Sequence, residues 1–212
     1  MLVHTHTEPG GKPLNEDYLI ARRHPSAHGT YLCLLADGQG GQSHGALAAR
    51  TACESAWTHA INQPPHTLSE KGTWSNILQR ADHKTSLTGG FTTLIALSIT
   101  PDLIAGASSG DSKAFFKHPS QTDLAEWTSH QRKNPPVGSE SADFVPFIHP
   151  AISGSRLMLL SDGVWKYSGY EALKQSFALP APSVPDHLRQ AVLSRAGSTL
   201  SDDFSIITID ID

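Results

Sequence analysis

The sequence lacks several features that would assign it to particular classes of protein. It has no run of 18 apolar residues and no secretory apolar segment, so neither a membrane span nor export is predicted. Its formal net charge of −4 provides no basic field for nucleic acid. Its only two cysteines, Cys33 and Cys53, lie in apolar segments, which favours small core residues over a disulfide. We therefore expect a cytoplasmic, monomeric protein without nucleic-acid or membrane partners.

Zinc-ligand spacings are also missing, although the chain has 12 histidines. The pair His4 and His6 has a ligand-like spacing, but the segment is polar, terminal and followed by Pro9-Gly10-Gly11. Chain ends of this composition are usually solvated. We therefore predict a solvated tail here and not a metal site.

The apolar pattern that is present predicts a single α+β domain over residues 1–212. Strands occur in runs and helices in pairs, without the strict alternation of a doubly wound sheet. Strands are predicted at 17–22, 30–36, 91–99, 102–108, 113–117, 156–161 and 204–211. Helices are predicted at 45–62, 67–87, 168–177 and 184–196.

One long segment, 118–154, breaks this pattern. It holds five prolines and shows little periodicity, so it reads as an irregular insertion. Loops of that length inside a compact domain are usually functional or disordered.

Carboxylates recur at the ends of the predicted strands. Asp37 closes one apolar strand before Gly38, Asp162 closes another before Gly163, and Asp202 precedes the last strand. Further acids at such positions are Glu16, Asp17, Asp111 and Asp203. A lone case is commonly a turn residue. Several carboxylates that converge must instead be protonated or bind cations, and an all-oxygen ligand set suits Mg²⁺ or Mn²⁺.

The glycines beside Asp37 fit the same interpretation. Gly38 would let the backbone approach a cation so that its carbonyl can become a ligand. Gly40 and Gly41 would keep the floor of such a site open.

Six segments in this order resemble the type 2C metal-dependent serine/threonine protein phosphatases, the PPM family, in a compact bacterial form. They are NED (15–17), ADGQGG (36–41), GGFTT (89–93), SGDSK (109–113), LLSDGVW (159–165) and SDDFSIITI (201–209). The resemblance implies an αββα sandwich, with two central antiparallel sheets flanked by helices. It also implies two Mn²⁺ or Mg²⁺ ions at one end of the sandwich.

By position, the resemblance assigns Asp37 to bridge both ions. Asp162 and Asp202 complete one ion, and the Gly38 carbonyl serves the other. Glu16 and Asp17 would lie beside the second ion, directly or through water. Asp111 matches the ligand of a third, weaker ion in many bacterial relatives, and 118–154 matches a flap that touches substrate.

The sequence departs from the family pattern at several positions. Lys12 stands where an arginine often clamps the substrate phosphate, and GDSK replaces GDSR. Asp202-Asp203 stands where Asp-Asn is typical. Gln39 stands where some relatives have a histidine thought to be a general acid. His44, five residues later, is an alternative acid, and metal-bound water is the other.

The implied reaction is hydrolysis of phosphoserine or phosphothreonine in proteins, opposing a serine/threonine kinase, by a water that bridges two metal ions. Two other functions remain open. One is a catalytically weak regulator that binds phosphoprotein, although the four core metal positions are retained. The other is a phosphatase of small phosphate esters. A structural protein with acid-capped strands is the remaining alternative.

Overall fold

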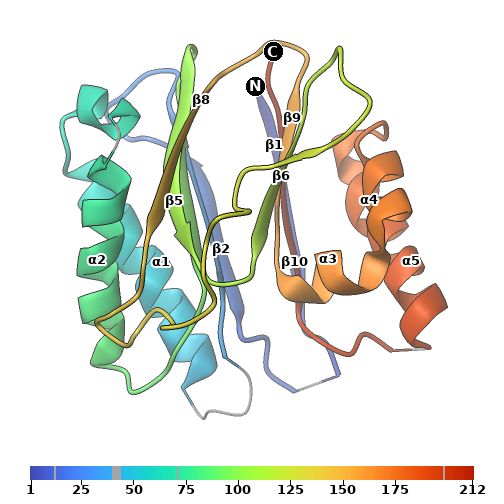
Figure 1. Ribbon diagram of the computed structural model, residues 1–212, viewed down its shortest axis with the longest axis horizontal. Helices are drawn as coiled ribbons and strands as arrows, with labels where there is room; N and C mark the ends of the chain where they lie inside the picture. Colours follow the sequence, from blue (N-terminus) through green and yellow to red (C-terminus); the bar gives the residue numbers. More distant parts are fainter. Residues whose placement is uncertain (12, 40–43, 71, 198) are drawn as a thin grey trace.

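The computed structural model is a four-layer sandwich in which two β-sheets lie between two layers of helices (Figure 1). It describes residues 1–11, 13–39, 44–70, 72–197 and 199–212. Every strand pairing in both sheets is antiparallel. The predicted αββα sandwich is therefore confirmed.

Each sheet has five strands. The first contains, in spatial order, β2 (Asp17–Arg23), β3 (Tyr31–Asp37), β4 (Leu94–Ile99), β5 (Leu103–Ser109) and β8 (Val145–Pro150). The second contains, in spatial order, β1 (Leu2–Glu8), β10 (Phe204–Asp210), β9 (Arg156–Leu160), β6 (Lys113–Lys117) and β7 (Ala125–Glu126).

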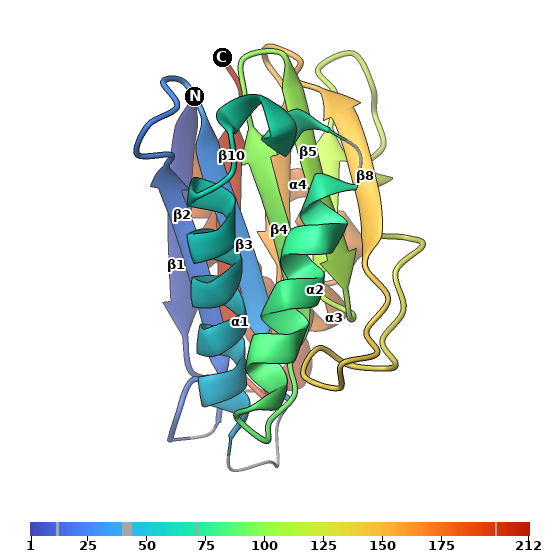
Figure 2. The ribbon, with the colours of Figure 1, turned by 90° about the vertical axis from the view of Figure 1, so that its left-hand side faces the viewer.

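Helices cover the outer face of each sheet. The first sheet is covered by α1 (Gly45–Ile61) and α2 (Thr73–Ser86), which lie side by side in Figure 2. The second is covered by α3 (Asp162–Ser168), α4 (Tyr170–Ser176) and α5 (Val184–Ala196). Short 3₁₀ turns occupy Pro65–Ser69 and Ala181–Ser183. No helix among the described residues is both long and apolar enough to span a bilayer.

The alternation of side chains along the strands builds three apolar layers. In β3, Leu32 and Leu34 pack toward α1 and α2, whereas Cys33 and Leu35 pack between the two sheets. Successive side chains of a strand point to opposite faces, so a continuous apolar run supplies both layers. Cys33 and Cys53 are free and buried, as predicted for core residues.

Two predictions about the strands were wrong. The segment with His4 and His6 is not a solvated tail, because it forms β1 and pairs with β10 from Leu2 to Glu8. The segment 118–154 is not irregular throughout, because it contributes β7 and β8, and β8 pairs with β5. Proline cannot donate to a strand ladder, but Pro146 and Pro150 lie in an edge strand, where the sheet tolerates it.

Two helix boundaries also differ from prediction. The predicted helix at 168–177 is preceded by another, α3, which begins at Asp162. Gly169, with φ of 80°, separates α3 from α4 in a conformation that favours glycine. At the other helix, α2 begins at Thr73, after the 3₁₀ turn that contains Leu68.

Candidate active site

Two strand-end carboxylates meet at one end of the first sheet. Asp17 begins β2 and Asp37 ends β3, and the two residues are partners in the strand register. The backbone of Asp37 is fixed by the residue that precedes β4, because its N–H donates to Thr93 Oγ1 at 3.0 Å and its carbonyl accepts from Thr93 N at 2.9 Å. The sheet therefore holds both carboxylates next to each other.

The residue after Asp37 must be a glycine. Gly38 N–H donates to the Glu16 carbonyl at 3.0 Å, which keeps the chain close to β2. A Cβ at this position would collide with the carbonyl of Gly45, the first residue of α1. The backbone at Gly38 therefore passes through a gap that only glycine fits.

The second sheet brings further carboxylates to the same place. Asp162 is the first residue of α3, and its N–H donates to Asp37 Oδ2 at 3.4 Å. Asp202 lies two residues before β10. These residues and Asp37 line one pocket of about 380 Å³. The full lining is Asp37, Gly38, Gln39, Thr92, Thr93, Asp111, Lys133, Asn134, Pro136, Asp162 and Asp202.

The five residues predicted as metal ligands thus lie around one pocket, and Glu16 and Asp17 are buried behind it. Within the described ranges, however, no three Asp, Glu, His or Cys side chains are already gathered as ligands of a single metal ion. Several carboxylates point elsewhere. Asp162 Oδ2, for instance, accepts a hydrogen bond from Lys166.

Asp17 and Asp37 are buried carboxylates, and no Lys or Arg side chain among the described residues is paired with either of them. The carboxylate of Asp17 is 7% exposed, and neither oxygen has a hydrogen-bond partner of good geometry. Burial, followed by repulsion from Asp203 and Asp162, raises the pKa of Asp17 to about 7, despite a lowering effect of the Ser205 and Ser161 hydroxyls.

The pKa of Asp37 is also raised, well above its usual range. The main cause is burial, and the charges of Asp17 and Asp162 add to it. A divalent cation between such groups would remove both the desolvation cost and the repulsion.

Asp111 has the opposite environment. Its Oδ2 accepts hydrogen bonds from Lys133 Nζ at 2.7 Å and from Lys166 Nζ at 3.0 Å. Burial alone would raise the pKa of Asp111, but the two ammonium groups outweigh it and lower the pKa. Lys166 also donates to Asp162 Oδ2 at 2.5 Å.

Asp203 is a structural residue and not part of the pocket lining. Its two oxygens accept from the backbone N–H groups of Gly10 at 2.8 Å and Glu16 at 2.7 Å. It therefore fixes the segment that leads into β2 and positions Asp17. This use of the second carboxylate explains why Asp202-Asp203 can replace the Asp-Asn of the family pattern.

Three of the predicted site positions, Lys12, Gly40 and Gly41, lie outside the described residues. His44 is described and exposed, directly before α1, and its carbonyl accepts from Ala48 N at 2.8 Å. Among the described residues that line the pocket, His44 does not appear.

The sequence analysis missed two lysines and an amide at this site. Lys133 and Asn134 lie in the segment interpreted as an irregular insertion, so nothing marked them as pocket residues. Lys166 could have been found, because it follows Asp162 by four residues and such pairs meet on a helix. That argument requires knowing that α3 begins at Asp162.

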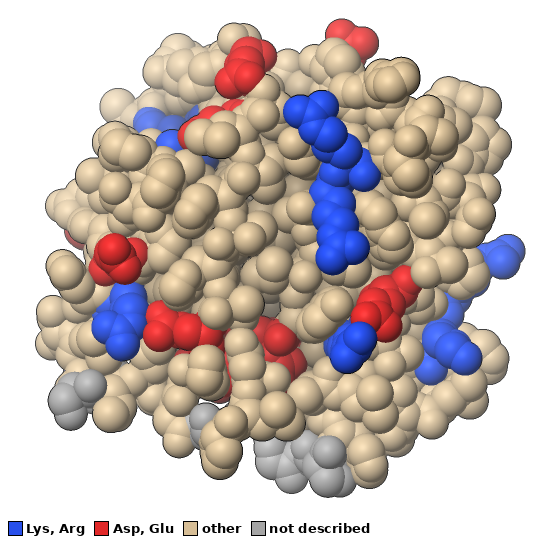
Figure 3. Space-filling view, turned by 180° about the vertical axis from the view of Figure 1, so that it is seen from behind, with Lys and Arg blue, Asp and Glu red and all other residues tan. Residues whose placement is uncertain are grey.

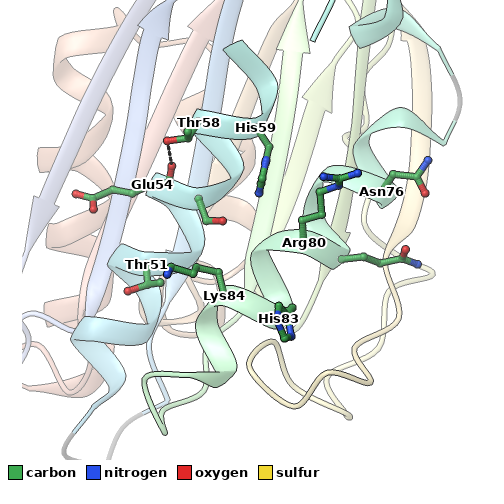
Figure 4. Close-up of a pocket in the computed structure, with 10 residues that line it drawn as sticks. Thr51, Glu54, Thr58, His59, Asn76, Arg80, His83 and Lys84 are labelled. Atoms are coloured by element: carbon green, nitrogen blue, oxygen red, sulfur yellow. Dashed lines mark hydrogen bonds between the residues drawn. The ribbon is translucent and has the colours of Figure 1, made fainter. Parts of the chain in front are cut away.

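A larger hollow of about 1030 Å³ lies between α1 and α2, away from these carboxylates (Figure 4). Its lining is polar and includes His59, Arg80, His83 and Lys84. Its one carboxylate, Glu54, accepts from Arg50 at 2.8 Å. Among the described residues that line it, this hollow therefore lacks the several carboxylates that line the pocket at Asp37.

The face shown in Figure 3 carries charges of both signs. Lys and Arg side chains form one elongated stripe on it, and Asp and Glu side chains lie in separate groups, some of them beside further Lys or Arg side chains.

Comparison with known proteins gives one family and several structures. A family model described as Stage II sporulation protein E (SpoIIE) matches residues 27–212. No curated protein sequence matches. A mutant of a bacterial serine phosphatase has a TM-score of 0.84 and 20% identity, covering 100% of this chain and 99% of its own.

Two further structures come from one phosphatase. The Mycobacterium tuberculosis serine/threonine phosphatase PstP/Ppp has a TM-score of 0.80 and 18% identity, with coverage of 100% and 98%. The PstP catalytic domain in complex with two manganese ions has a TM-score of 0.79, 18% identity and coverage of 100% and 98%. At these identities the likeness establishes the fold.

Proposed function

The chain belongs to the Stage II sporulation protein E (SpoIIE) family, and we propose that it is a metal-dependent phosphatase of phosphoserine and phosphothreonine in proteins. The predicted resemblance to type 2C phosphatases is confirmed at the level of family and fold. One observation carries the proposed activity: Asp37 at the end of β3, Asp162 at the start of α3 and Asp202 just before β10 line a single pocket. The serine/threonine phosphatase activity of the similar structures supports it.

The residues of the pocket fit two divalent cations. Asp37 would bridge them, Asp162 and Asp202 would complete one, and the Gly38 carbonyl would serve the other. The buried, unpartnered oxygens of Asp17 and the raised pKa of Asp37 indicate that negative charge here needs compensation. When bound, Mn²⁺ or Mg²⁺ supplies a hydroxide near neutral pH and neutralises the phosphoryl oxygens.

The chain itself positions these groups. Thr93, which precedes β4, fixes Asp37, and Asp203 fixes the start of β2 through the Glu16 N–H. Glu16 and Asp17 would act behind the ligands, through water. No activated serine or cysteine is required, and both cysteines are buried, with burial raising the pKa of Cys33 to about 12.

Three parts of the proposal rest on the sequence alone. Lys12 is proposed to bind the substrate phosphate, and His44 is proposed as a general acid. A phosphorylated protein made by an opposing serine/threonine kinase is proposed as the substrate. The pocket is open enough for a phosphorylated side chain, and its volume of about 380 Å³ also admits small phosphate esters.

The test compares two substrates under metal control. We expect manganese-dependent hydrolysis of p-nitrophenyl phosphate and of a phosphothreonine peptide, with complete loss in EDTA and recovery on adding Mn²⁺. Higher kcat/KM for the peptide than for a small alkyl phosphate separates a protein phosphatase from an esterase of small molecules. Turnover that survives EDTA contradicts the metal mechanism, and phosphopeptide binding without turnover indicates a regulator.

A further inference from the structure

The corner of the pocket around Asp111 already contains positive charge. Lys133 and Lys166 both donate to Asp111 Oδ2, at 2.7 Å and 3.0 Å, and Lys166 also donates to Asp162 Oδ2 at 2.5 Å. Two ammonium groups therefore face Asp111, and its negative charge is compensated without counting Asp162. Such a corner has no need for a further divalent cation.

Lys166 is held firmly in this arrangement. It follows Asp162 by one helical turn in α3, the spacing at which a carboxylate and an ammonium group meet. The neighbouring Trp165 donates from Nε1 to the Asp111 carbonyl at 2.9 Å, which ties α3 to the β5–β6 turn. The ammonium group of Lys166 thus links Asp111 to Asp162 through a fixed helix.

Lys133 is placed differently. Its side chain is 58% exposed, and it lines the pocket, whereas Lys166 does not appear in the described lining. The backbone that carries it is anchored, because Gly110 N–H donates to the Arg132 carbonyl at 2.9 Å. Lys133 is therefore a flexible cation on a fixed segment at the mouth of the pocket.

The donors of Lys133 are only partly used. An ammonium group has three N–H donors, and Lys133 directs one of them at Asp111 within the described structure. The remaining donors can reach an anion in the pocket. Asn134, the next residue, adds an amide donor to the same lining.

We propose that the corner formed by Asp111, Lys133 and Lys166 binds the phosphoryl group of the substrate through Lys133, with Lys166 in place of a third divalent cation. This rests on the proposed phosphatase function and departs from the third-metal role predicted for Asp111. Asp111 then pairs with both lysines when no phosphate is bound and competes with the phosphoryl group for Lys133. Lys133 supplies the substrate contact.

The first experiment measures binding of inorganic phosphate by calorimetry, with and without Mn²⁺. Lys133→Gln should weaken binding about 10-fold, the loss expected for one charge-assisted hydrogen bond. Lys133→Arg should restore it, because the guanidinium keeps the charge and the donors. Lys84→Gln, an exposed lysine of α2 in the other hollow, is the matched control and should leave phosphate affinity unchanged.

The second experiment replaces the carboxylate. Asp111→Asn should tighten phosphate binding several-fold, because it removes the anion that competes for Lys133. A metal ligand at this position would give the opposite sign, since losing it would remove a cation from the site. Manganese titration should show the same number of bound ions in Asp111→Asn as in the wild type.

Three results overturn this inference: wild-type protein that binds no phosphate at millimolar concentration, Lys133→Gln with wild-type phosphate affinity, or loss of one manganese ion in Asp111→Asn. Failure of the phosphatase proposal looks different, because it would appear as absent turnover in manganese. Metal-free phosphate binding lost in Lys133→Gln still supports the anion site in that case. Thermal unfolding of each variant checks that the fold is intact.

Discussion

Two sets of carboxylates at the same site differ in whether positively charged side chains lie beside them. Asp17 and Asp37 are paired with no Lys or Arg side chain anywhere in the described part of the chain, and burial raises the pKa of both. Asp111 lies between Lys133 and Lys166, and its pKa is lowered. Asp162 is linked to both sets: its N–H donates to Asp37 Oδ2, and its Oδ2 accepts from Lys166, which also donates to Asp111.

The difference teaches what a strand-end aspartate can mean. In the sequence, Asp37 and Asp111 share one pattern, in which an aspartate lies beside a glycine at the end of an apolar strand. The neighbours decide the chemistry: uncompensated carboxylates must take up a proton or bind an external cation, whereas compensated ones need neither. The predictions below test whether this distinction governs metal binding, stability and catalysis.

The largest effect is expected from Asp37→Asn, with Asp111→Asn as its matched partner. Losing the bridging charge should lower kcat by about 10³-fold or more, because metal-assisted hydroxide formation supplies several kcal/mol. It should also weaken Mn²⁺ binding measured by calorimetry. Asp111→Asn should keep the Mn²⁺ affinity within about threefold, since its charge is already balanced by lysines.

A folded Asp37→Asn variant that binds Mn²⁺ as tightly as the wild type would contradict the distinction between uncompensated and compensated carboxylates. Equal loss of Mn²⁺ affinity in both variants would also contradict this distinction, because Asp111 would then belong to the uncompensated set. Circular dichroism before the titration confirms that each variant is folded.

A smaller effect is expected on the stability of the metal-free protein. The pKa of Asp17 is about 7 in the folded chain against an ordinary 3.8, so the folded state binds more protons than the unfolded state between these values. The free energy of unfolding therefore falls as pH rises through this window. In EDTA, Tm should drop by roughly 5 °C between pH 5 and pH 7.

Asp17→Asn should make that slope shallower, because its amide does not titrate, whereas Asp37, whose pKa burial also raises, keeps the remainder. Asp111→Asn should leave the slope in place, since the stability contributed by the lowered pKa of Asp111 is already complete above its ordinary titration range and is constant across this window. Saturating Mn²⁺ should raise Tm most at the higher pH. A metal-free Tm that increases from pH 5 to pH 7 contradicts the assignment.

The sequence predicted the parts of the fold that follow from local patterns. Continuous apolar runs such as that of β3 identify strands buried on both faces, and the ends of those runs located Asp37 and Asp162 correctly at one pocket. β1 escaped notice because its polar residues, including His4 and His6, are only partly buried at a sheet edge. β8 was not predicted, because prolines such as those it contains are typical of loops.

Lys133 and Lys166 were not predicted as site residues, for a different reason. Lys133 and Asp111 are 22 residues apart, and their pairing depends on how the segment between β7 and β8 folds over the pocket. No periodicity encodes such a contact. The buried role of Asp203 is likewise tertiary, because its partners, the N–H groups of Gly10 and Glu16, lie at the other end of the chain.

The smallest expected effect concerns protonation of the leaving group. Gln39 lines the pocket, and an amide cannot donate a proton at neutral pH. His44 lies beside the same segment at the start of α1, packed so close to Gly90 that a Cβ there would collide with the His44 backbone. Its imidazolium form could serve as the acid.

Leaving-group dependence separates His44 from metal-bound water. An alkoxide such as threonine needs an acid, whereas p-nitrophenolate leaves without one. His44→Ala should therefore lower kcat about 10-fold or more for the phosphothreonine peptide, since general acid catalysis contributes at least that much, and leave p-nitrophenyl phosphate nearly unchanged. His66→Ala, a surface histidine in the turn Pro65–Ser69, is the matched control. Equal slowing of both substrates in His44→Ala, or of neither, assigns the proton to metal-bound water, and the cations that the uncompensated carboxylates would hold then account for the acid as well as the nucleophile.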